Sequence, residues 1–303
     1  LPVELNADPG RTVLLAGVGR SGTTWISNII NSGNNFRYIF EPFHPFKVPE
    51  AQAFQYHQYL RPGADDPVIF DAAKTILTGR FRNPWADRVN KKRIASRRLV
   101  KTIRANLMLG WIHRHFPEIP IVFLIRHPCA VVNSWIKLGW GRADNGEEND
   151  LTHCLIQESL VQDHLLPHMN AINGAGSEFE ELIFLWSILN YIPLRQLSQS
   201  DVHFIFYENV CLEPENEARR LLAFLDLPFR KSVARALERP SHMARPDSAI
   251  RTGASLTESW KASIRRAQEE RALEILSLFG LDALYAGDTL PVTGAGKVPA
   301  LLV

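Results

Sequence analysis

The chain alternates short apolar runs with segments in which apolar residues recur every three or four positions. A short apolar run predicts a buried strand, and the longer period predicts a helix with one buried face. The runs that predict strands are residues 12–19, 37–40, 98–102, 119–125 and a stretch within 201–210. Such alternation is typical of an α/β fold, with a mainly parallel central β-sheet flanked by helices. We expect residues 1–303 to form a single domain of this class.

Helices are predicted in the segments that follow these strands. They are residues 23–33 with Gly33 as the stop, 107–116, a helix opened by Pro128, then 155–168, 178–198, 214–227 and 257–279. Glycine after a helix and proline at its first turn are the usual boundary signals. Residues 43–97 show no clear period, although residues 65–67 predict a turn, and residues 139–150 predict a loop rich in glycine and acids.

Composition narrows the class of protein. Hydrophobic residues make up 46% and charged residues 22%, as in ordinary globular proteins, and the net charge of +2 is too small to indicate nucleic-acid binding. The three cysteines have neither disulfide nor metal spacing, so we expect a reducing, cytoplasmic location. The apolar runs are too short for a membrane segment, although the sequence starts at Leu1 and leaves open an anchor upstream. His113 and His115 lack further ligands at metal spacing, so no metal is expected.

The stretch AGVGRSGTTW has the outline of a phosphate-binding loop between a strand and a helix. Gly17 and Gly22 have the spacing of the motif G-x-x-x-x-G-K-[ST], and Thr24 occupies its last position. Thr23 stands where the motif has lysine, while a positive charge occurs earlier, at Arg20. We therefore interpret the loop as a site for a nucleotide that carries no γ-phosphate.

The residue types of this loop suit an anion. A helix N-terminus attracts phosphate, and glycines let the backbone approach it closely. Arg20 offers a planar fork of donors that matches phosphate or sulfate. Further glycines and hydroxyl donors are Gly19, Ser21, Thr23 and Thr24. The alternative is a tight strand-to-helix turn that merely contains glycines.

A second anion site is predicted after the strand at 119–125. Arg126 follows that strand, where ligands collect in open α/β sheets, and Ser134 lies about two helical turns further along. Both side chains could flank one phosphate. The alternative for Arg126 is an ordinary surface ion pair.

Six segments then carry a family resemblance. In order they are GRSGTTW, IFEP, VKTIR, FLIRHPCAVVNSW, FYENVCLEPENEARRLLAFLDLP and RTGASLTESWK. Together they resemble the sulfotransferases that use 3′-phosphoadenosine-5′-phosphosulfate (PAPS), and within them the carbohydrate sulfotransferase branch. The resemblance covers residues 12–261 and implies the sulfotransferase fold, a P-loop-like α/β sheet, with no metal ion.

The resemblance implies roles at the donor site. The loop residues would hold the 5′-phosphosulfate, with Arg20 stabilising charge as the sulfuryl group moves. Arg126 and Ser134 match the 3′-phosphate site, and Arg251 with Gly253 resembles the late segment that closes over it. Trp25 and Tyr207 match positions near the adenine, where aromatic faces stack, although Trp25 on an amphipathic helix is equally well explained as a core residue.

The resemblance also implies a base for the acceptor. Glu41, just after the second strand, matches the glutamate that serves as general base in the carbohydrate branch, and His44 competes with it. The alternative for Glu41 is a solvated acid beside a proline turn. Lys101 is expected to point toward the sulfate or the acceptor, and Arg104 to bind the acceptor or hold Glu41.

Between Arg80 and Arg104 the chain has ten lysines and arginines and one acid, Asp87. This run is either a solvated face or the wall of an acceptor cleft.

The leading hypothesis is therefore sulfuryl transfer from PAPS to the hydroxyl of a carbohydrate or another small-molecule alcohol, by in-line attack. A small-molecule kinase is the first alternative, against which the missing loop lysine argues. The second is a non-catalytic protein that binds an acidic glycan through the basic run.

Overall fold

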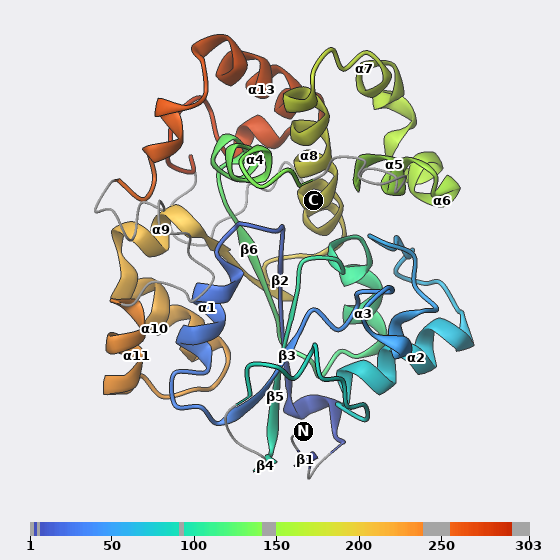
Figure 1. The fold of residues 1–303 in the computed structure, drawn as a ribbon, viewed down its shortest axis with the longest axis vertical. Coiled ribbons are helices and arrows are strands. Elements are labelled where there is room, and N and C mark those ends of the chain that lie inside the picture. The colour runs from blue at the N-terminus through green and yellow to red at the C-terminus, as the bar shows by residue number, and fades with distance from the viewer. Residues whose placement is uncertain (1–2, 5–6, 91–93, 141–149, 239–254, 293–303) are drawn as a thin grey trace.

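The computed structural model describes residues 3–4, 7–90, 94–140, 150–238 and 255–292 (Figure 1). Its centre is a five-stranded sheet in the order β3-β5-β2-β6-β7, and every neighbouring pair is parallel. The strands are β2 (Thr12–Gly17), β3 (Phe36–Phe40), β5 (Arg97–Thr102), β6 (Ile121–Ile125) and β7 (Val202–Phe206). The parallel α/β sheet predicted from the sequence is thus confirmed. Two short strands, β1 (Val3–Glu4) and β4 (Ile94–Ala95), pair separately.

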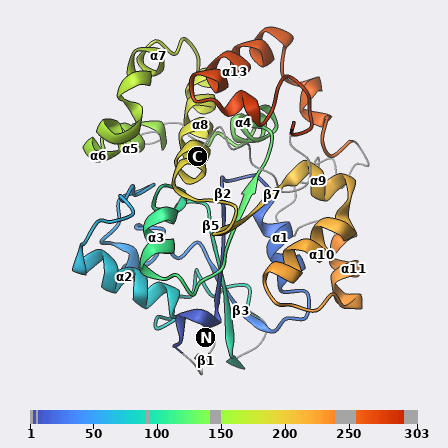
Figure 2. The ribbon, with the colours of Figure 1, turned by 180° about the vertical axis from the view of Figure 1, so that it is seen from behind.

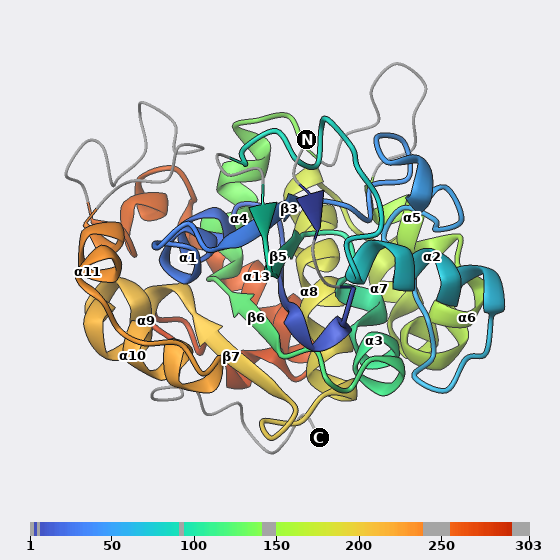
Figure 3. The same ribbon diagram turned by 90° about the horizontal axis from the view of Figure 1, so that it is seen from below.

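Helices cover both faces of this sheet (Figures 2 and 3). Along β2, Val13 and Leu15 belong to one buried cluster, whereas Leu14 and Ala16 belong to the other, because successive side chains of a strand point to opposite faces of the sheet. The first face packs against α1 (Thr23–Ile30), α9 (Tyr207–Leu212), α10 (Pro214–Phe224) and α11 (Lys231–Leu237). The second packs against α2 (Pro67–Leu77), α3 (Leu109–His115), α4 (Pro128–Ile136), α8 (Glu178–Gln196) and α13 (Arg266–Leu278).

The strand order places a switch point beside β2. From β2 the chain moves outward to β3 and then fills the gap with β5, whereas β6 and β7 add on the opposite side. In open α/β sheets, ligands bind beyond the carboxyl ends of the strands at such a point. The segments that leave β2 and β6 here contain Arg20 and Arg126. Gly17 pairs with Leu124, so the two strands end side by side and the two arginines follow at the same edge of the sheet.

Two predicted helices are interrupted. The predicted helix over residues 155–168 contains the last residue of α5 (Asp150–Leu155), followed by α6 (Glu158–Leu160), one π turn (Val161–Leu165) and one 3-10 turn (Leu166–His168). Gln157 is extended and its amide bonds the backbone of a distant segment, which ends α5. Residues 257–279 form a 3-10 turn (Ser259–Ala262) and then α13, because extended Arg265 caps α13 with Gln268.

Two boundaries also differ from the expectation. Helix α1 ends at Ile30 rather than Gly33, since the side chain of Asn31 exchanges two hydrogen bonds with the backbone of Phe36. The turn expected at residues 65–67 is the cap of α2: the Asp66 carboxylate accepts from the amides of the first helical turn.

The basic run from Arg80 to Arg104 is not one surface. Arg80 and Arg82 are exposed, whereas Arg98 is fully buried and donates to the hydroxyl of Thr12. Residues 91–93 lie outside the described residues. The described residues of the run therefore lie in several different environments, and its final cations, Lys101 and Arg104, belong to the candidate site described next.

Candidate functional site

The glycine loop turns sharply between β2 and α1. Gly22 has a φ of +106°, and a Cβ there would lie 2.7 Å from Cδ2 of the Tyr207 ring, so no larger residue fits. Arg20 also adopts a left-handed backbone, with a φ of +70°. Helix α1 starts at Thr23 without a side-chain cap on Gly22. Its first amides therefore suit an anion.

Arg20, Ser134 and Arg126 meet at this loop. The Nε of Arg20 donates to the Ser134 hydroxyl at 3.0 Å, and Nη1 of Arg126 donates to the carbonyl oxygen of Arg20 at 3.0 Å. The Nε of Arg126 is buried and has no hydrogen-bond partner within the described residues. The two anion sites predicted separately from the sequence thus form one continuous basic cluster.

Other loop residues hold its shape. Ser21 is fully buried, and both its amide and its hydroxyl donate to the carbonyl of Val18, at 3.2 and 2.7 Å. The carbonyl of Gly19 accepts from Nε1 of Trp135 at 2.9 Å. Ser21 therefore braces the loop, and any contact between its side chain and a ligand requires that bond to be exchanged.

Trp25 and Tyr207 pack edge to face, with ring centroids 5.8 Å apart. Trp25 is only 5% exposed, and its Nε1 donates to the carbonyl of Ala236 at 3.3 Å, which ties α1 to α11. The guanidinium of Arg126 lies 4.2 Å from the Tyr207 ring centroid. Trp25 is thus a core residue, and an adenine contact at this pair stays a prediction.

The late segment predicted to close over the phosphate lies outside the described residues. It contains Arg251 and Gly253.

A buried charge cluster lies around Glu41, which is 1% exposed. Its Oε1 accepts from Nζ of Lys101 at 2.5 Å, and its Oε2 accepts from Nη1 of Arg104 and the Ile103 amide, both at 3.0 Å. Strand pairing creates this contact, because Phe40 is in register with Lys101. The surface alternative for Glu41 is therefore wrong. Arg104 was expected to bind the acceptor or to hold Glu41, and in the structure it contacts Glu41. Lys101 was expected to point toward the sulfate or the acceptor, and its ammonium group contacts Glu41 instead.

The charges decide the protonation of this cluster. Burial alone would raise the pKa of Glu41, but the nearby charges of Lys101 and Arg104 outweigh it and lower that pKa. Burial lowers the pKa of Lys101, and Glu41 opposes that effect. Burial, reinforced by Arg104, lowers the pKa of His44 to about 4. At neutral pH, Glu41 is therefore a carboxylate and His44 is neutral.

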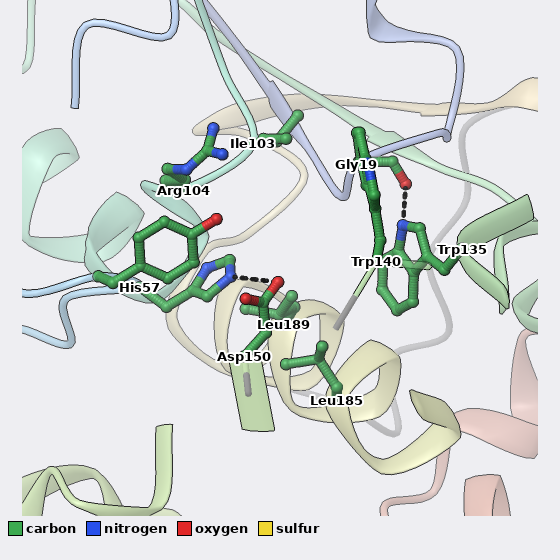
Figure 4. Close-up of a pocket in the computed structure, with 10 residues that line it drawn as sticks. Gly19, His57, Ile103, Arg104, Trp135, Trp140, Asp150, Leu185 and Leu189 are labelled. Carbon is green, nitrogen blue, oxygen red and sulfur yellow. Dashed lines mark hydrogen bonds and ion pairs between the residues drawn. The ribbon is translucent and has the colours of Figure 1, made fainter. Parts of the chain in front are cut away.

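A cavity of about 310 Å³ extends from the loop toward this cluster (Figure 4). Its lining residues are Gly19, Tyr56, His57, Ile103, Arg104, Trp135, Trp140, Asp150, Leu185 and Leu189. Glu41, His44 and Lys101 do not line it, and Arg104 is the member of the charge cluster that does. The cavity therefore joins the loop to the charge cluster through the Arg104 guanidinium.

Sequence reasoning missed most of this cavity. His57 comes from the segment without a period, and its Nε2 lies 3.7 Å from Oδ2 of Asp150, the last residue of the predicted loop. Leu185 and Leu189 lie one turn apart on α8, for which the sequence predicted a helix but no site residue. No local sequence pattern marks these residues as part of a site, because only the folded structure brings their distant segments together.

In the described part of the chain, no three His, Cys, Asp or Glu side chains gather where they could hold a metal ion. No helix there has the length and hydropathy needed to span a bilayer.

Comparison with known proteins identifies a protein family that this chain matches. The family model described as "Sulfotransferase family" matches residues 12–231, more than half of the chain. The search of curated proteins returned no match.

Several solved structures are also similar. The sulfotransferase domain from the curacin biosynthetic pathway has a TM-score of 0.47 and 16% identity, covering 88% of this chain and 96% of that domain. Mouse sulfotransferase SULT7A1 complexed with PAP has a TM-score of 0.45 and 11% identity, with coverages of 89% and 84%. Sulfotransferase STF9 from Mycobacterium avium has a TM-score of 0.43 and 13% identity, with coverages of 93% and 78%. Structural similarity with TM-scores and identities this low does not indicate an activity for this chain.

Proposed function

The chain belongs to the sulfotransferase family, and on that premise we propose that it transfers a sulfuryl group from PAPS to a hydroxyl acceptor. One observation carries the proposal. Arg20, Ser134 and Arg126 form a continuous basic cluster at the glycine loop, and a cavity large enough for a small acceptor starts at Gly19 of the same loop.

The residues at this loop fit a donor with two separated anionic groups. The α1 N-terminus and the Arg20 guanidinium would hold the 5′-phosphosulfate, while Arg126 and Ser134 would hold the 3′-phosphate. The buried, unpartnered Nε of Arg126 supports this assignment, because a buried donor requires an acceptor. A donor without a γ-phosphate also explains why Thr23 replaces the lysine of the nucleoside-triphosphate loop.

The chemistry is a displacement at sulfur. The acceptor oxygen forms the new O–S bond while the bond from sulfur to the bridging phosphate oxygen breaks, and the electron pair leaves on the 3′,5′-diphosphate product, PAP. Arg20 stabilises the negative charge that develops there, since its guanidinium stays protonated and acts electrostatically. The acceptor's proton must pass to a base.

In its simplest form the proposal gives this proton to Glu41. The charges of Lys101 and Arg104 keep its carboxylate ionised, so it can accept a proton at neutral pH. Both of its oxygens already accept hydrogen bonds, and Arg104 stands between them and the cavity. An acceptor hydroxyl therefore reaches Glu41 only by displacing Arg104 from Oε2.

Binding experiments test the donor assignment. In isothermal titration calorimetry of the whole protein, PAP should bind with micromolar or tighter affinity, and AMP, which lacks the 3′-phosphate, far more weakly. Preference for Mg-ATP would instead support a kinase. Binding of a sulfated glycan with no affinity for PAP would support a non-catalytic glycan-binding protein. Either result would reject sulfuryl transfer.

The acceptor in this proposal is an alcohol. Resemblance to the carbohydrate branch favours a sugar hydroxyl, and radiolabelled PAPS with a panel of monosaccharides and simple alcohols tests that choice.

A further inference from the structure

Two tryptophans at the end of α4 contact the same glycine of the loop. The Nε1 of Trp135 donates to the carbonyl oxygen of Gly19 at 2.9 Å. The ring of Trp140 packs on the side of Gly19 where a Cβ would point, since that Cβ would lie 2.7 Å from its Cζ3. Figure 4 shows both rings on one side of the cavity, across from His57. Trp140 is therefore placed where the loop and the cavity meet.

Burial explains one of these tryptophans and not the other. Trp135 is 4% exposed and belongs to the hydrophobic core. Trp140 is 41% exposed, so much of the apolar area of its ring contributes nothing through burial. The three atoms nearest to a Cβ at Gly19 are two ring carbons of Trp140 and the Cδ1 of Ile103. The loop is thus covered here by apolar groups that offer a water molecule no hydrogen bond.

The backbone after α4 holds Trp140 in this position. The amide of Trp140 donates to the carbonyl oxygen of Trp135 at 3.0 Å, and the amide of Gly139 donates to that of Ile136 at 3.1 Å. This pair of bonds is a Schellman motif, in which the residue at the position of Gly139 is left-handed. Gly139 accordingly has a φ of +66°. The end of the helix therefore sets the direction in which the indole points.

In the proposed reaction, the sulfuryl group lies at the same place. The loop would hold the 5′-phosphosulfate, and the acceptor would bind in the cavity that Gly19, Trp135 and Trp140 line. The sulfur atom must then lie between loop and cavity, beside the Trp140 ring. The bond between its phosphate and sulfate is an anhydride, which water attacks at sulfur as an alcohol does. Such a site has to exclude water to protect its reactive group.

We propose that Trp140 is a specificity-determining residue that excludes water from the sulfuryl group, so that sulfur is transferred to the acceptor and not to water. This inference rests on the proposed function. The suppressed reaction is hydrolysis. A water oxygen forms a bond to sulfur, the bond from sulfur to the bridging phosphate oxygen breaks, and the electron pair leaves on PAP. Inorganic sulfate and the two protons of the water are released.

Hydrolysis of PAPS in the absence of any acceptor tests this inference. The whole protein is incubated with saturating sulfur-labelled PAPS, and released inorganic sulfate is counted. Trp140→Ala should hydrolyse PAPS about tenfold faster than the wild type, because water then reaches the sulfur. Trp140→Phe keeps a ring and should lie between the two. A merely structural defect would slow hydrolysis, so a gain in rate distinguishes the two explanations.

A control variant removes an exposed aromatic ring elsewhere. Phe224 on α10 is 37% exposed, close to the value for Trp140, and does not line the cavity. Phe224→Ala should hydrolyse PAPS as the wild type does. Titration of each variant with PAP confirms that the donor site is saturated in the assay.

A pair of variants at Gly139 tests the placement of Trp140 without changing its ring. A Cβ at Gly139 would meet no atom within 4 Å, so neither substitution creates a clash. Asparagine adopts the left-handed conformation, whereas β-branched valine rarely does. Gly139→Val should therefore displace Trp140 and raise the rate of hydrolysis, and Gly139→Asn should keep the rate of the wild type.

The outcomes separate this inference from the proposed function. If the wild type binds PAP but Trp140→Ala hydrolyses PAPS no faster, Trp140 does not exclude water. An equal gain in Phe224→Ala would also overturn its role, and equal rates in Gly139→Val and Gly139→Asn would overturn the placement by the helix end. A wild type that does not bind PAP would reject the proposed function itself, and this inference with it.

Discussion

Nη1 of Arg126 donates a hydrogen bond to the carbonyl oxygen of Arg20, at 3.0 Å. The two residues are 106 positions apart and follow the adjacent strands β6 and β2. One guanidinium therefore fixes the backbone of the loop whose own arginine holds Ser134. If Arg126 binds the donor as proposed, this contact couples donor binding to the shape of the loop.

The first prediction concerns this arginine. Arg126→Ala should weaken PAP binding about tenfold to a hundredfold, because a hydrogen bond to a charged group contributes about 1.5–3 kcal/mol. AMP, without the 3′-phosphate, should lose less. Calorimetric titration of both nucleotides measures the difference. Arg82→Ala, at an exposed position, is the control and should bind as the wild type. Unchanged PAP affinity in Arg126→Ala would remove Arg126 from the 3′-phosphate site.

The second prediction concerns the turn at Gly22. Gly22→Ala must place a Cβ 2.7 Å from the Tyr207 ring on a backbone with a φ of +106°. The free energy of unfolding in urea should fall by about 1–3 kcal/mol from the backbone strain alone, and PAP affinity should fall with it. Gly63→Ala is the control, since a Cβ there meets no atom within 4 Å. If both variants unfold alike, the loop tolerates a side chain and the close approach is not required.

The third prediction concerns the ion pair between Glu41 and Lys101. Glu41→Gln leaves the buried ammonium of Lys101 without its counter-charge, which should cost about 3–5 kcal/mol of the free energy of unfolding. The double variant Glu41→Gln with Lys101→Met removes that charge, so it should be more stable than Glu41→Gln alone. Urea denaturation of the two single variants and the double variant measures the coupling. Additive losses would mean that the pair contributes nothing as a pair.

The fourth prediction is the pH dependence of the same site. The pKa of Glu41 is lower in the folded protein than in the unfolded chain, where a glutamate titrates at about 4.3. The contribution of Glu41 is therefore complete above about pH 4.3 and is lost as the pH falls through the folded-state pKa. The stability gap between the wild type and Glu41→Gln should narrow in acid. A gap that stays constant, or widens, would contradict the lowered pKa.

The fifth prediction concerns the turn that carries His57. Gln157→Leu leaves the amide of Tyr59 unpaired in a buried site, so unfolding free energy should fall by about 1–3 kcal/mol. Because the same turn carries His57, which lines the cavity, transfer of sulfate from PAPS should also fall. The exposed Gln162 offers the matched control Gln162→Leu. Unchanged transfer in Gln157→Leu would limit Gln157 to a structural role.

Local patterns determined much of the framework. The five sheet strands, the glycine loop and the start of α4 at Pro128 were all predicted, because burial of short apolar runs and the special backbone of glycine and proline act within a few residues. The basic residues after two of these strands were predicted to bind anions, and strand order brought them together.

The same reasoning failed where a distant partner competes with local propensity. Residues 155–168 have a helical pattern, yet Gln157 bonds to the backbone of His57 and Tyr59 and so leaves the helix. Arg98 belongs to a basic run that was interpreted as either a solvated face or the wall of an acceptor cleft, yet β5 carries it into the interior against Thr12.

The sequence by itself determined a parallel α/β sheet with a phosphate-type loop and a glutamate after the second strand. Only the tertiary structure decided what that glutamate contacts, because the register of β3 on β5 places Lys101 against it and Arg104 beside it. The cavity with His57 and Asp150 was likewise decided by packing alone. Its walls come from segments far apart in the chain, and long-range contacts of this kind depend on how complete surfaces fit together.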